Sequence, residues 1–226
     1  MKEYTSLFLD LDNTLLDFSM AEKVAIRKVL IKHNLPSNDF AVSTYSEINR
    51  TYWERFERGE IEKSDIFEGR FKIFLEHFKV SGDTKAISED YFFELSQGYY
   101  VVDGAFDILN YLKSKGYKLY ATTNGISLTQ YNRIKGSGLD VYFDGVFVSE
   151  DANHQKPEKE YFQYVIENIP EKNKENILII GDSQSSDILG GINSGIDTCW
   201  FNPNNQIPKY KSQFEIKSLY ELKNIL

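Results

Sequence analysis

Residues 7 to 17 read Leu7-Phe8-Leu9-Asp10-Leu11-Asp12-Asn13-Thr14-Leu15-Leu16-Asp17. The apolar start of this stretch predicts a β-strand over residues 5–9 that ends at a carboxylate. Because an ionised aspartate is costly to bury, a strand that runs into acids indicates a site at its end. Side chains two residues apart on an extended chain project to the same side, so Asp10 and Asp12 can face one substrate together. A solvated turn after a strand is the plainer alternative, and the rest of the chain decides between them.

The composition limits the classes of function. The 226-residue chain has a formal net charge of -8, which argues against binding a nucleic acid polymer because no basic surface is evident. Cys199 is the only cysteine, so neither an internal disulfide nor a thiolate metal cluster can form. The three histidines, at positions 33, 77 and 154, lack the spacing of zinc ligands. We therefore expect any metal to be a hard cation held by carboxylates.

The N-terminal region does not resemble a signal peptide. Asp10 and Asp12 interrupt its only apolar run, and no later segment approaches the length of a membrane span. These features predict a cytoplasmic protein with no membrane partner. The sequence does not indicate an oligomeric state.

From residue 18 to residue 100 the apolar pattern is helical, with no convincing strand. Breaks at Leu35-Pro36-Ser37, at Gly59 and at Ser81-Gly82-Asp83 divide it into four predicted helices. Ser64 is a candidate N-cap for the third. The first strand is thus separated from its partners by a long helical insertion.

After residue 103 helices and strands alternate, which predicts a parallel sheet covered on both faces. The predicted strands are residues 117–122, 145–148, 177–180 and 198–201. Predicted helices include residues 105–112 and 188–193, and Ser218 with Glu221 forms a candidate capping box for a last helix. The expected fold class is α/β, with a Rossmann-like parallel-sheet core.

Ligands of open α/β sheets bind beyond the carboxyl ends of the strands. Three polar clusters fall at predicted strand ends in this chain: Asp10 with Asp12, Thr123 with Asn124, and Asp182 with Asp187. Each alone could be a turn. Their agreement with one geometry favours a single site.

These residues resemble the signatures of the haloacid dehalogenase (HAD) superfamily of phosphohydrolases. Four motifs occur in the order of that superfamily: Asp10-Leu11-Asp12-Asn13-Thr14, Thr123-Asn124, Lys156-Pro157 and Gly181-Asp182-Ser183-Gln184-Ser185-Ser186-Asp187. The resemblance spans essentially the whole chain. It implies a catalytic core over residues 1–16 and 103–226, and an all-helical cap domain over residues 17–102.

The resemblance also implies catalytic roles. Asp10 would be the nucleophile that forms an aspartyl-phosphate. Asp12 would protonate the leaving alkoxide and then activate water. The dehalogenases of the superfamily lack this second acid, so a haloacid dehalogenase is the less favoured interpretation.

The remaining motif residues would bind the metal and the phosphate. Mg²⁺ would be held by the Asp10 carboxylate, the Asp12 backbone carbonyl and Asp182, while Asp187 would orient a metal-bound water or Lys156. The Thr123 hydroxyl and the Asn124 amide would bind phosphate oxygens. Lys156 would stabilise the transferring phosphoryl group.

The substrate is less well defined. Several segments resemble the pyrimidine 5′-nucleotidase branch, which hydrolyses nucleoside monophosphates: Tyr52-Trp53, residues 59–61, Gly69-Arg70-Phe71, residues 186–193 and Thr198-Cys199-Trp200. Two places depart from the usual pattern, Asp103-Gly104 and Asn153-His154-Gln155. The open alternatives are a phosphatase for sugar phosphates or phosphoglycolate, and a non-catalytic binding protein.

Overall fold

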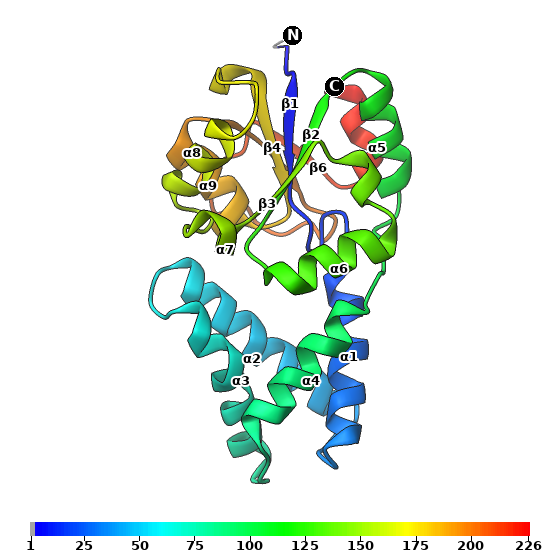
Figure 1. Cartoon of the computed structure of the whole chain (residues 1–226), viewed down its shortest axis with the longest axis vertical. Helices are drawn as coiled ribbons and strands as arrows, with labels where there is room; N and C mark the ends of the chain where they lie inside the picture. The colour runs from blue at the N-terminus through cyan, green and yellow to red at the C-terminus, as the bar shows by residue number, and fades with distance from the viewer. Residues whose placement is uncertain (1–2) are drawn as a thin grey trace. The chain divides into compact units, whose positions relative to one another are not determined.

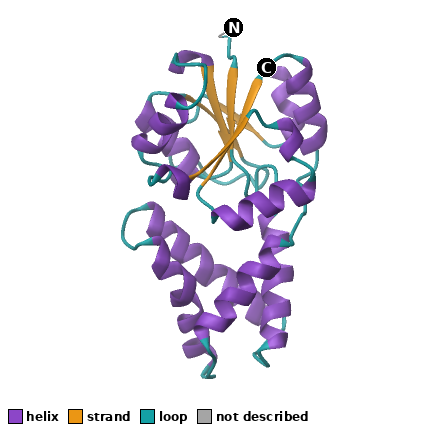
Figure 2. Cartoon of the chain, in the orientation of Figure 1, coloured by secondary structure: helices purple, strands orange, loops and turns teal. Residues whose placement is uncertain are grey.

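The computed structural model describes residues 3–226, which form two compact units: the chain up to Asp17 together with Val101–Leu226, and the intervening Phe18–Tyr100 (Figure 1). We call these the core unit and the helical unit. The helical unit begins one residue later and ends two residues earlier than the cap domain expected from the sequence, residues 17–102. All named strands lie in the core unit (Figure 2).

A six-stranded sheet organises the core unit, and its strand order is β3-β2-β1-β4-β5-β6. Every neighbouring pair is parallel, which confirms the predicted α/β class with a parallel sheet. The strand β6 was not predicted, because three residues are too few to show an alternating pattern. The strands are β1 (Ser6–Leu9), β2 (Lys118–Thr123), β3 (Gly145–Val148), β4 (Ile177–Gly181), β5 (Asp197–Phe201) and β6 (Phe214–Ile216).

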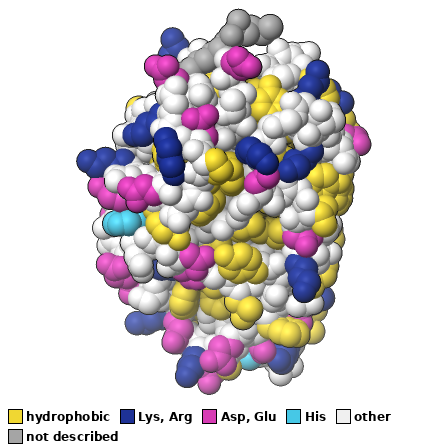
Figure 3. Space-filling view, turned by 45° about the horizontal axis from the view of Figure 1, so that its top comes forward, with side chains coloured by type: hydrophobic (Ala, Val, Ile, Leu, Met, Phe, Trp, Pro, Cys, Tyr) yellow, Lys and Arg dark blue, Asp and Glu magenta, His cyan; other side chains and the backbone are white. Residues whose placement is uncertain are grey.

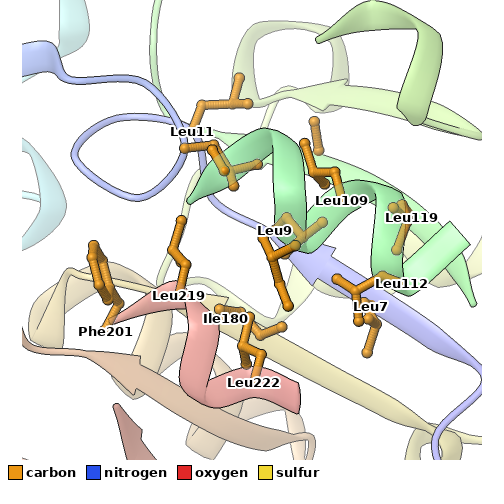
Figure 4. Close-up of a cluster of buried hydrophobic side chains, with 14 of the residues drawn as sticks. Leu7, Leu9, Leu11, Leu109, Leu112, Leu119, Ile180, Phe201, Leu219 and Leu222 are labelled. Atoms are coloured by element: carbon orange, nitrogen blue, oxygen red, sulfur yellow. The ribbon is translucent and has the colours of Figure 1, made fainter. Parts of the chain in front are cut away.

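The central strand β1 packs against two separate apolar clusters. Successive side chains of a strand point to opposite faces, and Leu7 and Leu9 accordingly join one cluster (Figure 4) while Phe8 joins the other. The first cluster includes residues of α5 (Ala105–Ser114) and of the 3₁₀ helix η4 (Leu219–Asn224). The second includes residues of α8 (Lys159–Glu167). Helices therefore cover both faces of the sheet, as the alternating pattern predicted.

The core unit has further short helical segments that differ in part from expectation. A π-helical turn precedes the predicted helix at 188–193 and extends that segment toward the N-terminus. The Ser218–Glu221 capping box is confirmed, although it opens a 3₁₀ rather than an α-helix. These segments are α6 (Ser127–Ser137), η1 (Asp140–Tyr142), α7 (Ser149–Ala152), η2 (Lys174–Asn176), η3 (Gln184–Ile188) and α9 (Leu189–Ser194).

The helical unit consists of four helices around its own apolar core. The prediction that Ser64 caps the third helix is wrong. Glu62 occupies that position and forms a capping box with Asp65, so two acidic side chains satisfy the free backbone donors. The helices are α1 (Phe18–Lys32), α2 (Asp39–Glu57), α3 (Lys63–Phe78) and α4 (Thr84–Ser96).

A buried polar network crosses the interior of the helical unit. The Asn49 side-chain amide donates to Glu22 at 2.6 Å, and Arg70 Nη1 donates to the Asn49 carbonyl oxygen at 2.7 Å. The Arg70 guanidinium also lies 4.6 Å from the ring centroid of Tyr91 and 5.0 Å from that of Phe92. The network thereby joins all four helices. We call Glu22, Asn49 and Arg70 the helical cluster.

On the face shown in Figure 3, Lys and Arg side chains are interspersed with Asp and Glu side chains and do not form one positive patch. Within residues 3–226, none of the helices combines the length and the apolar character needed to cross a membrane.

Candidate active site

The sheet topology brings the three predicted polar clusters to one edge. β1 lies between β2 and β4, so Asp10, Asn124 and Asp182 follow the carboxyl ends of three adjacent strands. The backbone N–H of Asp10 extends the ladder by donating to the Ile180 carbonyl at 2.9 Å. The edge is therefore the position at which parallel α/β sheets bind ligands.

Lys156 lies at the centre of this edge. Its ammonium group is 2.7 Å from Asp10 Oδ1 and 2.6 Å from Asp187 Oδ1, and it donates to the Thr122 carbonyl at 3.0 Å. Only 1% of the residue is exposed. Burial disfavours the charged amine, but the carboxylates of Asp10 and Asp187 outweigh it and raise the pKa of Lys156. Lys156 is therefore a fixed positive charge between two acids.

Asn124 anchors the loop that carries Lys156. Its side-chain Nδ2 donates to the Lys156 carbonyl at 2.8 Å, and the Lys156 backbone N–H donates back to Asn124 Oδ1 at 2.8 Å. The sequence indicated a phosphate-binding amide at this position but not this reciprocal contact. The structure thus joins both polar atoms of the Asn124 side chain to the backbone of Lys156.

Thr14 connects the first and last motifs. Its hydroxyl donates to Asp10 Oδ2 at 3.1 Å, and it accepts the backbone N–H of Asp182 at 3.1 Å. Trp200 on β5 holds the same loop by donating its indole N–H to the Asp182 carbonyl at 2.8 Å. Thr14, four residues after Asp10, therefore joins the Asp10 carboxylate to the backbone of Asp182.

The Asp187 carboxylate is held on both oxygens. Oδ1 binds Lys156, and Oδ2 accepts the backbone N–H of Ser183 at 3.1 Å. Gly181 leaves room for it, because a Cβ at that position would lie 2.1 Å from Asp187 Oδ2. These contacts are consistent with the prediction that Asp187 orients a metal-bound water or Lys156.

Three carboxylates could hold a metal ion here. One oxygen from each of Asp10, Asp182 and Asp187 lies within 4.8 Å of the others, and Lys156 is the ammonium group among them. Burial raises the pKa of Asp10 to about 7. It also raises the pKa of Asp182, and the neighbouring carboxylates add to this effect. Such an excess of buried negative charge fits a divalent cation with oxygen ligands. We call Asp10, Lys156, Asp182 and Asp187 the core cluster.

A model of the family described as "haloacid dehalogenase-like hydrolase" matches residues 4–195. The chain belongs to this family. The resemblance seen in the sequence motifs is thereby confirmed, and the six-stranded sheet with an inserted helical cap is the HAD fold.

Three relatives of this HAD-like hydrolase match over nearly their full lengths. YfnB of Bacillus subtilis is 41% identical over 228 residues, covering 100% of this chain and 97% of YfnB. A crystal structure of YfnB bound to magnesium has a TM-score of 0.94 to this chain, with 40% identity and coverage of 100% and 99%. The pyrimidine 5′-nucleotidases PynA of Streptococcus pneumoniae and YjjG of Escherichia coli are 37% and 28% identical, covering 99% and 97% of this chain and 97% and 96% of their own.

Two further residues of this HAD-like hydrolase contact Asp12 and were missed in the sequence. Gln130 and Arg133 lie one turn apart on α6. Gln130 Nε2 donates to Asp12 Oδ2 at 2.9 Å and to the Thr123 hydroxyl at 2.7 Å. Arg133 Nη1 forms an ion pair with Asp12 Oδ1 and donates to Gln130 Oε1 at 3.0 Å.

The sequence of α6 itself indicates that Gln130 and Arg133 face the interior. The buried positions of α6 are Thr129, Gln130, Arg133 and Ile134. A helix that turns Gln and Arg toward the interior needs polar partners there. Gln130 lies four residues before Ile134 and Arg133 lies three residues after Gln130, so helical spacing could have marked both as inward-facing.

Proposed function

We propose that this HAD-like hydrolase is a magnesium-dependent phosphomonoesterase that acts through an aspartyl-phosphate, with pyrimidine nucleoside monophosphates as substrates. The observation that carries the proposal is the buried Lys156 between Asp10 and Asp187, next to Asp182. This arrangement gives a carboxylate nucleophile a fixed positive charge and an acidic metal site at the same strand ends.

The proposed reaction has two displacements. In the first, an Asp10 carboxylate oxygen forms a bond to phosphorus as the bond to the leaving oxygen breaks. The leaving oxygen takes the electron pair of that bond and a proton from Asp12. In the second, Asp12 takes a proton from water, the water oxygen bonds to phosphorus, and the bond to Asp10 breaks. Inorganic phosphate and the free enzyme result.

The other residues bind and orient the phosphate in this scheme. Lys156 stabilises the charge on the transferring group. The Thr123 oxygen accepts from the Gly125 N–H and from Gln130, so its own hydrogen is the donor to a phosphate oxygen. When bound by Asp10, Asp182 and the Asp12 carbonyl, Mg²⁺ would offset the repulsion between these acids and a phosphate dianion.

Similarity to two named pyrimidine 5′-nucleotidases over nearly the whole chain supports the choice of substrate. The experiment is phosphate release in Mg²⁺ from matched sets of nucleoside monophosphates, sugar phosphates and phosphoglycolate. A tenfold lead of pyrimidine monophosphates in kcat/KM, about 1.4 kcal/mol, is the expected result. Addition of EDTA should remove the activity.

Two other outcomes would change the proposal. Metal-dependent activity that is flat across the panel, or highest on a sugar phosphate or phosphoglycolate, would keep the phosphatase chemistry and reject the nucleotide substrate. Chloride release from a 2-haloacid without phosphate release from any ester would reject the phosphatase itself.

A further inference from the structure

We propose that Gln130 and Arg133, the α6 pair, are positioning residues that hold the Asp12 carboxyl group in the orientation from which it transfers protons. This inference rests on the proposed role of Asp12 as acid and base. It adds two residues of the core unit to the catalytic arrangement, each acting through Asp12 rather than on the substrate.

Contacts to both oxygens of one carboxylate carry the inference. Gln130 donates to Asp12 Oδ2 at 2.9 Å, and Arg133 pairs with Oδ1. A single contact would leave the group able to rotate about its bond to Cβ. Two donors from one rigid helix fix both the side-chain torsion and the plane of the carboxyl group. The second lone pair of each oxygen remains for the transferred proton.

The pair is itself held in one arrangement. Arg133 donates to Gln130 Oε1 at 3.0 Å. With its oxygen facing Arg133, the Gln130 amide must present its two N–H groups on the other side, where they reach Asp12 and the Thr123 hydroxyl. The same amide therefore sets the acid and the predicted phosphate donor relative to each other.

Burial argues against a purely structural explanation. Gln130 is 1% exposed and Arg133 is 0% exposed, whereas 28% of the Asp12 side chain is exposed. Well-packed apolar residues in place of a buried ion pair are often neutral or stabilising. A helix selected only for packing would place aliphatic side chains at these two positions. Gln130 and Arg133 instead face Asp12, the residue that must exchange protons in the proposed reaction.

The test uses esters that differ in their need for an acid. A nucleoside monophosphate releases a strongly basic alkoxide, which requires a proton from Asp12. 2,4-Dinitrophenyl phosphate releases a weakly basic phenolate, which does not. We measure kcat/KM for both esters, because this ratio reports the first displacement only. The variants are Gln130→Met, Arg133→Met and the milder Arg133→Lys, with Lys135→Met as a charge-matched control on the exposed side of α6.

We expect Arg133→Met to lower kcat/KM for the nucleotide by roughly 10²-fold and for the dinitrophenyl ester by less than about threefold. Gln130→Met should lower kcat/KM for both esters, because it also releases the Thr123 hydroxyl, but the loss for the nucleotide should be roughly tenfold larger. Arg133→Lys should recover part of the loss, and Lys135→Met should change neither ester. Circular dichroism checks folding; where Arg133→Met does not fold, Arg133→Lys and Gln130→Met carry the test.

Asp12→Asn separates this inference from the proposed function. It should show the same selective loss on the nucleotide. Equal losses on both esters in the α6 variants, with a selective loss in Asp12→Asn, would overturn the positioning role alone. Equal losses in Asp12→Asn as well would overturn the acid role of Asp12, and the positioning role with it.

Discussion

The core cluster and the helical cluster both bury charge, but they balance it differently. The helical cluster sets one carboxylate, Glu22, against one guanidinium, Arg70, with Asn49 bonded to both. The core cluster sets three carboxylates against one ammonium group. In the helical cluster the two opposite charges offset each other, whereas the excess of carboxylates in the core cluster can be offset by a bound cation or by protons. The difference in charge balance makes the core cluster, and not the helical cluster, the candidate cation site, without reference to any motif.

The largest expected effect is on Asp10, the proposed nucleophile of the core cluster. Asp10→Asn should lower kcat by at least roughly 10⁴-fold, about 5 kcal/mol, because an amide cannot form the covalent intermediate. The protein should still fold, since the amide is nearly isosteric and relieves the crowding of carboxylates. Asp39→Asn, whose side chain is 96% exposed, is the control. Substantial activity in pure Asp10→Asn protein would show that another residue attacks phosphorus.

The helical cluster should respond in stability instead. Arg70→Met leaves Glu22 buried without the nearby positive charge that favours its ionised form and should lower the free energy of unfolding by about 3–5 kcal/mol. Arg50→Met is a matched control, since the Arg50 side chain is 67% exposed and pairs with Glu47 and Glu54 at the surface. Denaturant titration measures the free energy of unfolding of both variants.

The double variant Glu22→Gln/Arg70→Met sharpens this comparison. Removing both charges should cost less than the sum of the two single changes. Strictly additive losses would show that Glu22 and Arg70 do not balance each other, and the contrast between the two clusters would fail.

Magnesium should stabilise the protein through the core cluster. At a concentration 100-fold above its Kd, a ligand that binds only the folded state adds about 2.7 kcal/mol to stability. Thermal unfolding with MgCl₂ and with EDTA should therefore differ for the natural sequence. Asp182→Asn should abolish most of that difference, while Arg50→Met should keep it. An unchanged Mg²⁺ effect in Asp182→Asn would place the cation elsewhere.

The smallest effect on stability is expected at Asp144, a partly exposed carboxylate that pairs with Lys113 and Lys118. Partial burial acts to raise the pKa of Asp144, but the Leu119 N–H, Lys113 and Lys118 outweigh it and lower this pKa to about 2. The folded pKa thus lies below the unfolded value of 3.8, so the stabilisation is present above about pH 4 and is lost as the pH falls toward 2.

Because solvent screens this group, we expect Asp144→Asn to cost only about 1 kcal/mol at pH 7. Unfolding measured from pH 7 down to pH 3.5 should show the cost beginning to shrink below pH 4. Asp140→Asn, an exposed neighbour, should show no such trend. A cost for Asp144→Asn that grew with acidification would contradict the assigned direction of the pKa.

The sequence was sufficient for the residues whose positions follow from strand ends. Asp10, Thr123 and Asp182 each lie at or just after a strand, and the carboxyl ends of parallel strands meet at one edge. Lys156 is different, because it lies in a loop between α7 and α8. Only the resemblance to a family indicated that it belongs to the site.

The residues that were missed act through long-range contacts. Gln130 and Arg133 reach a carboxylate 118 and 121 residues away in the chain, and Arg70 is buried among aromatic rings of α2, α3 and α4. A local pattern shows which side of a helix is apolar but not which distant group meets a polar residue on that side. Such partners become visible only once the helices are packed.

The position of β1 has a consequence for protein synthesis. Its residues are made before those of both partner strands, since Leu7 pairs with Leu119 of β2 and with Leu178 of β4. The helical unit, by contrast, is one continuous segment. By the time the ribosome has added Tyr100, all four helices of this unit have been made, whereas neither of the strands that pair with β1 has been made. The nascent chain must therefore keep an apolar strand from aggregating until its partner strands have emerged, and the end of the sheet that carries Asp10 and Asp182 is complete only after β4.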